Sequence, residues 1–332
     1  MSFTKQPFAP CPVCNANDIT FLLQVKDYSL TQENFQVIQC EKCNLKYTDP
    51  IPSVEAIAPY YNFPSYISHT DIKEGWMNKI YHNVRVYTLA QKTSWIQSLF
   101  TGHKGNLLEV GAGTGAFSNA MQMKGWNVTA LEPDASSRKK AFENYSINLL
   151  PIDQLYSLED AQFDVITLWH VLEHVHDLKK QITAFKRLLK PTGRLIIAVP
   201  NYTSFDAQYY NKYWAAYDVP RHLYHFSPKA MRYLMNEFEM KVMDIKPMWF
   251  DSFYVSLLSE KYKNSGTIGV IRAFIIGLIS NIKAMRNNDK ASSIIYTIKK
   301  IDDIDTIAQL VTQSLWTHAL YFDNEFYYKN AV

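Results

Sequence analysis

Hydrophobic and polar residues alternate along the middle of the chain in a pattern typical of strands separated by helices. Short apolar runs predict buried strands, and segments whose apolar residues recur every three or four positions predict helices. The predicted strands span 107–110, 127–131, 163–169 and 194–199, and the predicted helices span 117–124, 135–144 and 177–189. Such alternation predicts a mostly parallel, doubly wound α/β sheet with helices on both faces.

The pattern continues on both sides of this region. Ser227 and Pro228 are typical of the N-cap and first turn of a helix, here one that ends near Phe238. The remaining predicted elements are a helix at 76–100, strands at 241–246 and 293–299, a largely helical insertion at 251–290 between these strands, and a helical tail beyond Lys300.

Prolines at positions 50, 52, 59 and 64 indicate a linker after an N-terminal module. The aromatic and polar stretch at 60–69 is expected either to close over a ligand as a lid or to pack as part of this linker. We therefore expect a module at 1–50, a linker and helical lid at 51–104, an α/β domain at 105–300 with substrate-cap insertions near 201–226 and 251–290, and a helical tail at 301–332.

The segment LLEVGAGTG, residues 107–115, joins the first predicted strand to a helix through a glycine-rich turn. Gly111, Gly113 and Gly115 permit tight backbone geometry and the close approach of a ligand, which a side chain would block. The next strand ends in Glu132, about 20 residues beyond the turn, where a carboxylate that binds ribose hydroxyls is expected. The pattern predicts a site for a nucleotide-like cofactor; the alternative is a strand-to-helix connection without a ligand.

Two features favour a methyltransferase over a dinucleotide dehydrogenase: the acidic Glu109 before the first glycine, and the later segment FDVITLWHVLEHV. Residues 105–200 resemble the class I S-adenosylmethionine-dependent methyltransferases, whose turn has the form E-x-G-x-G-x-G. The resemblance implies a Rossmann-like sheet of seven strands, one of them antiparallel, with a short third strand at 147–150. It also implies that the cofactor is held by Glu109, Gly111, Ala112, Gly113, Gly115, Glu132, Asp153 and His170.

Cysteine occurs at four positions, as two C-x-x-C pairs: Cys11 with Cys14 and Cys40 with Cys43. Four thiolates in two such knuckles give the tetrahedral sulfur cage that zinc prefers, with no open position for a catalytic water. We therefore expect a structural Zn²⁺ ion in a small zinc-ribbon-like module. The alternatives are two disulfides, which the lack of a secretion signal disfavours, and a redox pair, which the presence of two pairs disfavours.

Chemistry is expected past the carboxyl ends of the fourth and fifth strands, where open α/β sheets bind ligands. His170, Glu173 and His174 follow the fourth strand at i, i+3 and i+4, so a helical turn would bring them to one side to bind a divalent metal or move a proton. Similar E-x-x-E-H segments bind a divalent ion in ubiquinone-pathway O-methyltransferases and small-RNA 2'-O-methyltransferases, whereas His170 here replaces the first glutamate. The alternative is that His170 lines the cofactor pocket while Glu173 and His174 hold the fold.

The second segment, WAAYDVPRHLYHFSP at 214–228, resembles a block that follows strand five in one branch of these enzymes. Asp218 and Arg221 are expected to pair or to clamp a polar substrate, and His222 or His225 to accept a proton as the methyl group is transferred. Histidine suits this role because its pKa lies near neutral pH. His222 is the leading candidate for the base, and a capping or packing role is the alternative for His225.

Composition narrows the possible partners. The 332 residues carry a net charge of +3 with scattered Lys and Arg, which gives little support to nucleic-acid binding. The first residues lack the apolar core of a signal peptide, so we expect a cytoplasmic protein with reduced thiols. The apolar stretch 268–282 is interrupted by Arg272 and Asn281, so we expect it to cap the substrate cleft or contact a second subunit rather than span a membrane, with contact to a lipid-like substrate as the alternative.

These features together predict a cytoplasmic methyltransferase that passes the methyl group of S-adenosylmethionine to an O, N or C atom of a small molecule. Methyl transfer is an in-line displacement at an activated sulfonium, so the enzyme mainly positions the reactants and excludes water. Zinc-knuckle N-termini also occur in sugar C-methyltransferases, which suggests a sugar or polysaccharide precursor as the acceptor. The alternatives are an RNA methyltransferase with a four-cysteine zinc module, and a SAM-binding scaffold without activity.

Overall fold

The computed structural model describes residues 8–61, 76–100 and 104–301. A six-stranded sheet forms its centre, in the strand order β5-β4-β6-β7-β10-β9. Strands β5, β4, β6 and β7 run parallel, and β10 runs antiparallel to both of its neighbours. The strand bounds are Asn106–Val110 (β4), Asn127–Leu131 (β5), Phe163–Trp169 (β6), Leu189–Pro200 (β7), Met240–Pro247 (β9) and Ser293–Lys300 (β10).

This sheet confirms the predicted α/β fold, but it has six strands rather than seven. Of the predicted third strand at 147–150, Leu150 pairs with Leu131 in an isolated parallel bridge. Ser146 before this segment has a left-handed φ of +57°, and Pro151 after it lacks a backbone N–H, so the extended conformation is confined to a few residues.

The helices occupy the connections that the periodicity predicts. Ser227 caps α7 by accepting a hydrogen bond from the Ala230 N–H at 3.2 Å, which confirms the predicted helix start. The α-helices are Trp76–Leu99 (α2), Ala116–Met123 (α3), Ala135–Tyr145 (α4), Leu178–Leu188 (α5), Phe205–Tyr210 (α6), Pro228–Glu237 (α7), Asp251–Tyr262 (α8) and Gly266–Arg286 (α9). Short 3-10 helices are Ala58–Tyr61 (η1), Ile152–Ser157 (η2), Leu172–His174 (η3), Asn211–Tyr213 (η4), Ala215–Tyr217 (η5) and Asn288–Lys290 (η6).

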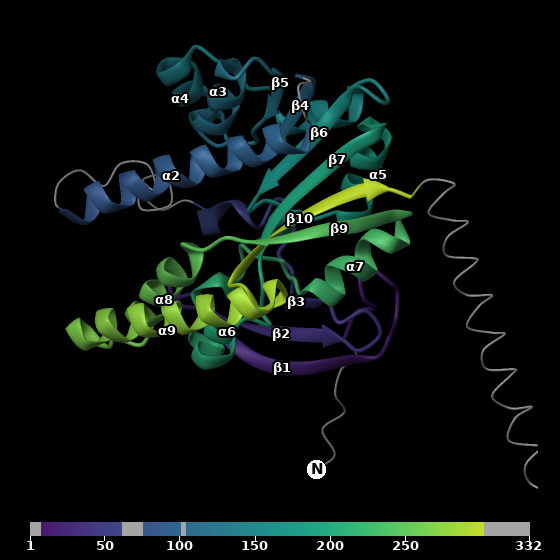
Figure 1. Cartoon of the computed structure of the whole chain (residues 1–332). Coiled ribbons are helices and arrows are strands. Elements are labelled where there is room, and N and C mark those ends of the chain that lie inside the picture. The colour runs from purple at the N-terminus through teal and green to yellow at the C-terminus, as the bar shows by residue number, and fades with distance from the viewer. Residues whose placement is uncertain (1–7, 62–75, 101–103, 302–332) are drawn as a thin grey trace, which may run out of the picture.

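The N-terminal module forms a second sheet on the side of the molecule opposite α3 and α4 (Figure 1). Its strands are Ile19–Lys26 (β1), Asn34–Cys40 (β2), Lys46–Asp49 (β3) and Tyr224–His225 (β8), in the order β1-β2-β3-β8. Because β8 belongs to the segment predicted to carry the chemistry, the module is not a separate appendage. It shares a sheet and a hydrophobic core with the α/β part, in which Leu45 and Tyr47 pack in the same cluster as Leu223 and Phe226.

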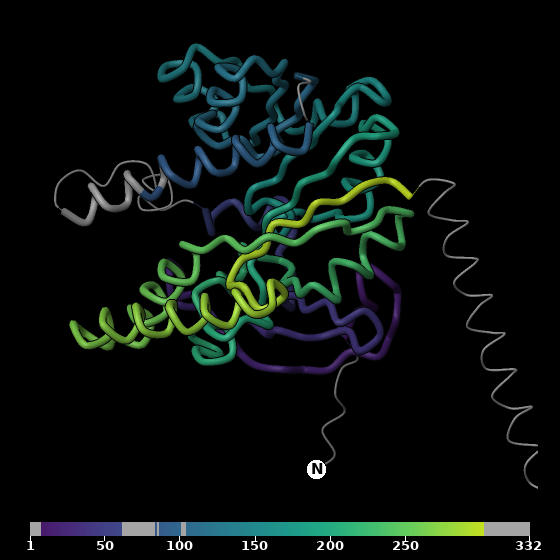
Figure 2. The backbone as a smooth tube through the Cα atoms, in the orientation of Figure 1, coloured from purple at the N-terminus to yellow at the C-terminus, as the bar shows by residue number. Residues whose placement is uncertain are grey.

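The predicted helical insertion is confirmed as the α8–α9 pair, which projects from the body of the molecule in Figure 2. Helix α9 has 21 residues and is longer than the apolar stretch predicted at 268–282. Among the described residues it is the one helix whose length and apolar composition would suffice to cross a membrane. Most of the predicted lid, from residue 62 onward, and the tail from residue 302 onward lie outside the described residues.

Candidate functional site

The glycine turn lies at the carboxyl end of β4, as the sequence predicts. Gly111, Gly113 and Gly115 have left-handed φ angles of +72°, +55° and +77°, which glycine adopts without strain. A Cβ atom on Gly111 would lie 2.4 Å from Val171 Cγ2, so the turn passes against the segment that follows β6. A Cβ atom on Gly113 would meet no described atom within 4 Å. The turn is therefore an open backbone cradle, and its shape fits a nucleotide-like cofactor.

Two buried carboxyl groups support this turn. Glu132, which is 8 % exposed at the end of β5, accepts hydrogen bonds from the N–H of Gly113 at 2.7 Å and of Asp134 at 3.0 Å. Glu109 is buried within β4 and accepts a hydrogen bond from the Ser118 hydroxyl of α3. Burial raises the pKa of Glu109 to about 8. Both predicted residues thus lie beside the turn: Glu132 holds its backbone at Gly113, and Glu109 ties β4 to the helix that the turn opens.

Asp153, one of the residues that the resemblance implies for the cofactor, is exposed in the first turn of η2. Leu150, three residues earlier, pairs with Leu131, the last residue of β5. Because these two segments run parallel, Asp153 and Glu132 follow neighbouring extended segments at the same edge of the sheet. The structure brings the glycine turn, Glu132 and Asp153 to one edge, as expected for a cofactor site.

His170 directly follows β6 and has a left-handed conformation with a φ of +57°. Its Nε2 lies 3.1 Å from Asp251 Oδ2, and its Nδ1 lies 3.5 Å from Glu173 Oε1. Burial alone would lower the pKa of His170, but the hydrogen bonds and charges of Asp251 and Glu173 raise it to about 9. At neutral pH His170 is therefore a cation held between two carboxylates. Asp251 begins α8 and lies far away in the chain, so the sequence pattern contained no signal for this contact.

Glu173, His174 and His222 form a second cluster, in which one ligand atom from each residue lies within 4.8 Å of the others. The sequence predicted instead that His170 would join Glu173 and His174. His170 does contact Glu173, but it does not join His174 in this cluster. The residues form a left-handed turn and a short 3-10 helix rather than an α-helical turn, and the His170 ring lies between Glu173 and Asp251. His222 takes its place.

Backbone carbonyl groups fix both imidazole rings of this cluster. His174 Nδ1 lies 3.0 Å from the Arg221 carbonyl oxygen, and His222 Nδ1 lies 2.8 Å from the Ala216 carbonyl oxygen. A carbonyl oxygen accepts a hydrogen bond, so each Nδ1 carries a proton and each Nε2 is the ring nitrogen left for another partner. The Tyr61 hydroxyl lies 3.0 Å from the same Nδ1 of His174, a contact that the sequence did not predict.

Glu173 is the acidic member of the cluster and has no exposed surface. Its carboxylate is 3.5 Å from His170 Nδ1, but neither oxygen accepts a hydrogen bond from the part of the chain that the structure describes. Burial alone would raise the pKa of Glu173, but the close His170 cation at 3.5 Å and the nearby imidazoles lower it. Burying a carboxylate whose oxygens lack hydrogen-bond donors costs folding free energy unless the carboxylate binds a proton or a cation.

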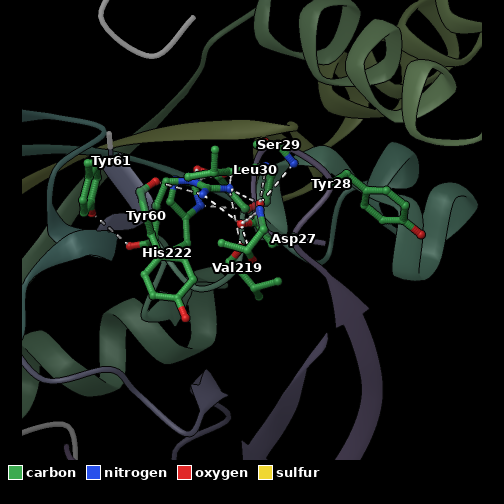
Figure 3. A network of polar contacts seen from close by, with 12 residues as sticks. Asp27, Tyr28, Ser29, Leu30, Tyr60, Tyr61, Val219 and His222 are labelled. Atoms are coloured by element: carbon green, nitrogen blue, oxygen red, sulfur yellow. Dashed lines mark hydrogen bonds and ion pairs between the residues drawn. The ribbon is translucent and has the colours of Figure 1, made fainter. Parts of the chain in front are cut away.

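Asp218 and Arg221 pair with each other, which was one of their two predicted roles. Arg221 Nε donates to both carboxylate oxygens of Asp218 at 3.0 Å, and Arg221 Nη2 lies 2.8 Å from Asp27 Oδ1. Arg221 also donates to the Tyr60 carbonyl oxygen at 3.1 Å. Figure 3 shows Asp27, Tyr60 and Val219 gathered in this network of polar contacts. The Arg221 side chain is 1 % exposed, so a clamp on substrate is the wrong role for it. It joins β1, η1 and the segment before His222.

His225 in the same segment also has a structural role. It is 3 % exposed, pairs with Lys46 between β3 and β8, and packs edge-on against the Tyr217 ring at 5.0 Å. Its Nε2 lies 3.3 Å from Thr48 Oγ1, and burial holds its pKa well below the ordinary value. These contacts correspond to the packing role that the sequence left open. Thr48 also donates to the His222 carbonyl oxygen at 2.7 Å, so the module supports the His222 backbone directly.

The four cysteines converge at the turn between β2 and β3, because Cys40 ends β2 and Cys43 lies in the turn before β3. Cys11 and Cys43 have sulfur atoms 3.5 Å apart, those of Cys14 and Cys40 are 3.4 Å apart, and all four lie within 4.8 Å of one another. A disulfide requires about 2.05 Å, whereas four sulfurs bound to one zinc lie roughly 3.8 Å apart. Each knuckle ends in a left-handed asparagine, Asn15 and Asn44, whose N–H groups donate to the carbonyl oxygens of the first cysteines at 2.9 Å. The donor set and spacing fit zinc.

Comparison with known proteins gives one family match. The profile of a family described as a methyltransferase domain matches residues 82–244, which include the glycine turn, His170, the Glu173 cluster and most of the sheet. Residues 11–43, with the four cysteines, lie outside this match.

Among curated proteins, the chain is similar to ubiquinone biosynthesis O-methyltransferases. It is 31 % identical to that of Pseudomonas aeruginosa over 117 residues, which cover 33 % of this chain and 50 % of the relative. It is 28 % identical to that of Xanthomonas oryzae over 158 residues, which cover 44 % of this chain and 66 % of the relative. The chain thus spans about half to two thirds of the length of these relatives.

Among solved structures, one neighbour is the phosphoethanolamine N-methyltransferase 2 of Haemonchus contortus in complex with S-adenosyl-L-methionine. Its TM-score is 0.48 at 13 % identity, with 86 % of this chain and 69 % of the neighbour covered.

Proposed function

We propose that this chain transfers the methyl group of S-adenosylmethionine to a small-molecule acceptor, because residues 82–244 match a methyltransferase domain. The observation that carries the proposal is the open cradle at Gly113, flanked by Glu132 and Asp153 at one edge of the sheet. The cofactor supplies a methyl group on a positively charged sulfur. The curated relatives are named O-methyltransferases, which favours an oxygen atom as the acceptor and disfavours RNA.

We propose that the cofactor half of the site acts mainly by holding the cofactor in position for methyl transfer. The backbone of Gly111 and Gly113 would hold the amino-acid end of the cofactor, and the Glu132 carboxylate, which already orders the turn, would bind the ribose hydroxyls. Asp153 would lie near the adenine. Such placement converts methyl transfer into a unimolecular step and needs little chemistry from the protein.

On the acceptor side we propose His222 as the base. Its Nδ1 is bound to the Ala216 carbonyl oxygen, which leaves Nε2 free to take the proton of an acceptor hydroxyl. The Glu173 carboxylate in the same cluster would stabilise the imidazolium that forms. His170, already protonated and held by Asp251, is unsuited to accept a proton and would position Glu173 instead.

This role has a direct test in the replacement of His222 by alanine. We expect kcat with the true acceptor to fall by about 10²–10⁴-fold, while the dissociation constant of S-adenosylmethionine stays unchanged. The matched control is His176→Ala, because His176 lies near the same segment but contacts the Pro52 carbonyl oxygen instead. Unchanged turnover of the His222 variant would overturn the base assignment.

A second candidate for the cluster is a divalent metal ion bound by Glu173, His174 and His222. The specific observation is that two imidazoles, each with Nε2 left for another partner, meet a carboxylate whose oxygens accept no hydrogen bond from described residues. A bound ion would supply Lewis-acid chemistry at the acceptor oxygen and would occupy Nε2 of His222, which then could not act as a base. Metal analysis before and after dialysis against a chelator distinguishes the two: an added equivalent of metal that Glu173→Gln abolishes would favour the ion.

We propose a structural zinc ion at Cys11, Cys14, Cys40 and Cys43. The four sulfurs leave no position for a reacting water, and binding can add about 10–16 kcal/mol of apparent folding energy to so small a module. One zinc per chain, lost on replacing Cys11 by serine, is the expected result of elemental analysis. A protein that holds no zinc when purified without chelator would contradict this assignment.

For the acceptor we propose a hydroxylated small molecule, with sugar or polysaccharide precursors to be tested first. Transfer of a labelled methyl group from S-adenosylmethionine to sugar nucleotides, to phenols and to RNA can be measured side by side. Labelling of the first would support the sugar assignment, and labelling of phenols alone would replace it. A protein that binds the cofactor but labels no acceptor class would favour the scaffold alternative.

A further inference from the structure

Helix α9 places its small residues against the protein and its large apolar residues in solvent. The buried face consists of Gly269, Ala273, Ile276, Gly277, Ser280 and Ala284, so Ile276 is its single large apolar side chain. The α9 apolar face, as we name it, consists of large side chains that are 46–68 % exposed: Ile268, Ile271, Phe274, Ile275, Leu278 and Met285. A surface helix of a soluble protein has the opposite arrangement, with its large apolar residues toward the core. A continuous apolar stripe of this kind marks a contact surface.

The opposite side of α9 is fixed, so the helix cannot rotate to bury this face. A Cβ atom on Gly277 would lie 2.7 Å from Phe253 Cδ1 of α8, which shows how closely the two helices pack. Ser280 donates a hydrogen bond of 2.6 Å to the buried Asp206 of α6. Because α9 packs along α8 and is bonded to α6, it would lie along a surface rather than cross a membrane, although its length would suffice.

The charges around the α9 apolar face indicate which partner covers it. Helix α9 contains Arg272, Lys283 and Arg286 and no acidic residue, and Lys261 and Lys263 lie at the C-terminal end of α8. Arg272 pairs with Glu260 of α8 at 3.7 Å, so the net positive charge comes from the other four. Two copies of this helix placed face to face would bring cations together without a carboxylate on either helix to pair with them. An apolar stripe with a basic border is typical of helices that lie in the headgroup region of an anionic bilayer.

We propose that the α9 apolar face docks this protein on an anionic lipid bilayer, with α9 lying in the plane of the headgroups. The large apolar side chains enter the acyl boundary and the basic residues contact lipid phosphates. The proposal does not depend on methyl transfer, because it concerns a surface rather than the reacting groups. Its failure and the failure of the proposed function are therefore separate outcomes.

The test is the binding of the full chain to vesicles of phosphatidylcholine with and without phosphatidylglycerol, measured by flotation. We expect binding to the anionic vesicles that weakens at high salt, since the lipid charges are then screened. The double variant Ile271→Ser/Phe274→Ser should reduce the partition coefficient at least about tenfold, because two large apolar side chains are lost from the buried contact. Phe142→Ser is the matched control, since Phe142 is 55 % exposed on α4, and this variant should bind as the wild type does.

Several results would overturn the proposal. One is a wild-type chain that stays unbound from anionic vesicles; another is a double variant that binds as well as the wild type. A dimer in sedimentation that the double variant dissociates, without vesicle binding, would assign the face to a second copy. Vesicle binding that appears after deletion of residues 302–332, and is absent with them, would assign the face to the C-terminal tail.

Discussion

Replacing Arg221 by methionine should destabilise this protein far more than removal of an exposed cation. The Arg221 guanidinium is 1 % exposed and binds Asp27, Asp218 and the Tyr60 carbonyl oxygen. Methionine keeps much of the apolar stem but leaves Asp27, which is also buried, without its cation. Because this network joins the N-terminal module to the segment before His222, the perturbation tests whether the two parts fold as one unit.

The magnitude follows from the burial of the pair. Removing one partner of a buried ion pair costs about 3–5 kcal/mol, since the remaining charge stays in a poorly solvated position. Asp27 keeps local donors, namely the N–H groups of Ser29, Leu30 and Thr31 and the Thr31 hydroxyl. We therefore expect a loss near the lower limit, about 3 kcal/mol in the free energy of unfolding at neutral pH.

The loss should depend on pH with a definite sign. Burial alone would raise the pKa of Asp27, but its hydrogen bonds with Arg221 and Thr31 and the Arg221 charge lower it overall. A carboxyl group whose pKa is lowered by folding contributes stability above its unfolded pKa, and this contribution is lost as pH falls through the folded pKa. The difference between wild type and variant should be widest at neutral pH and should narrow below about pH 4.

Urea denaturation followed by tryptophan fluorescence measures this difference. The matched control is Arg232→Met, since Arg232 is half exposed and pairs with Asp289 at 3.7 Å. That exposed pair is worth at most about 1 kcal/mol. Equal losses for the Arg221 and Arg232 variants, or a loss that does not change between neutral and acid pH, would refute the reasoning.

Three further predictions follow from the site and the module. Gly111→Ala should weaken S-adenosylmethionine binding at least about tenfold in calorimetry, because its Cβ would lie 2.4 Å from Val171 Cγ2 at a left-handed φ; unchanged affinity would contradict the account of the turn. The pKa of His170 is raised to about 9 by Asp251 and Glu173 against the effect of burial, so its contribution to stability is full below about pH 6.5 and lost as pH rises through about 9. In the Asp251→Asn variant, the urea midpoint should therefore fall much less as pH rises through this range. Identical plots of urea midpoint against pH for wild type and variant would argue against the His170–Asp251 ion pair. Removal of zinc should speed hydrogen exchange at the Thr48 N–H, which bonds to the Leu223 carbonyl oxygen. The N–H of Ile196 in the central sheet should stay protected. Equal protection of Thr48 with and without metal would show that the module folds without the ion.

The cofactor half could be predicted from the sequence because its signals are local. The strand at 163–169 matches β6, and the glycine turn, Glu132 and the Ser227 cap lie where short patterns place them. Each depends on a few consecutive residues, whose backbone requirements are visible in the sequence. The third strand was the exception, because Pro151 and the left-handed Ser146 limit pairing to Leu150.

The acceptor half could not be predicted in the same way, because its contacts join residues far apart in the chain. His222 meets Glu173, Asp27 meets Arg221, and Asp251 meets His170. Helical spacing predicted His170 beside His174, but a left-handed residue directly after β6 sends the two rings in different directions. The pairing of β3 with β8 also could not be predicted from the sequence, although this pairing gives His225 its structural role.

The central claim is that the glycine turn binds S-adenosylmethionine, and calorimetric titration of the purified protein tests it most directly. The account predicts micromolar binding of S-adenosylmethionine and S-adenosylhomocysteine, with no heat from NADH as the control. Binding of neither compound would contradict it and would leave the turn as a strand-to-helix connection without a ligand.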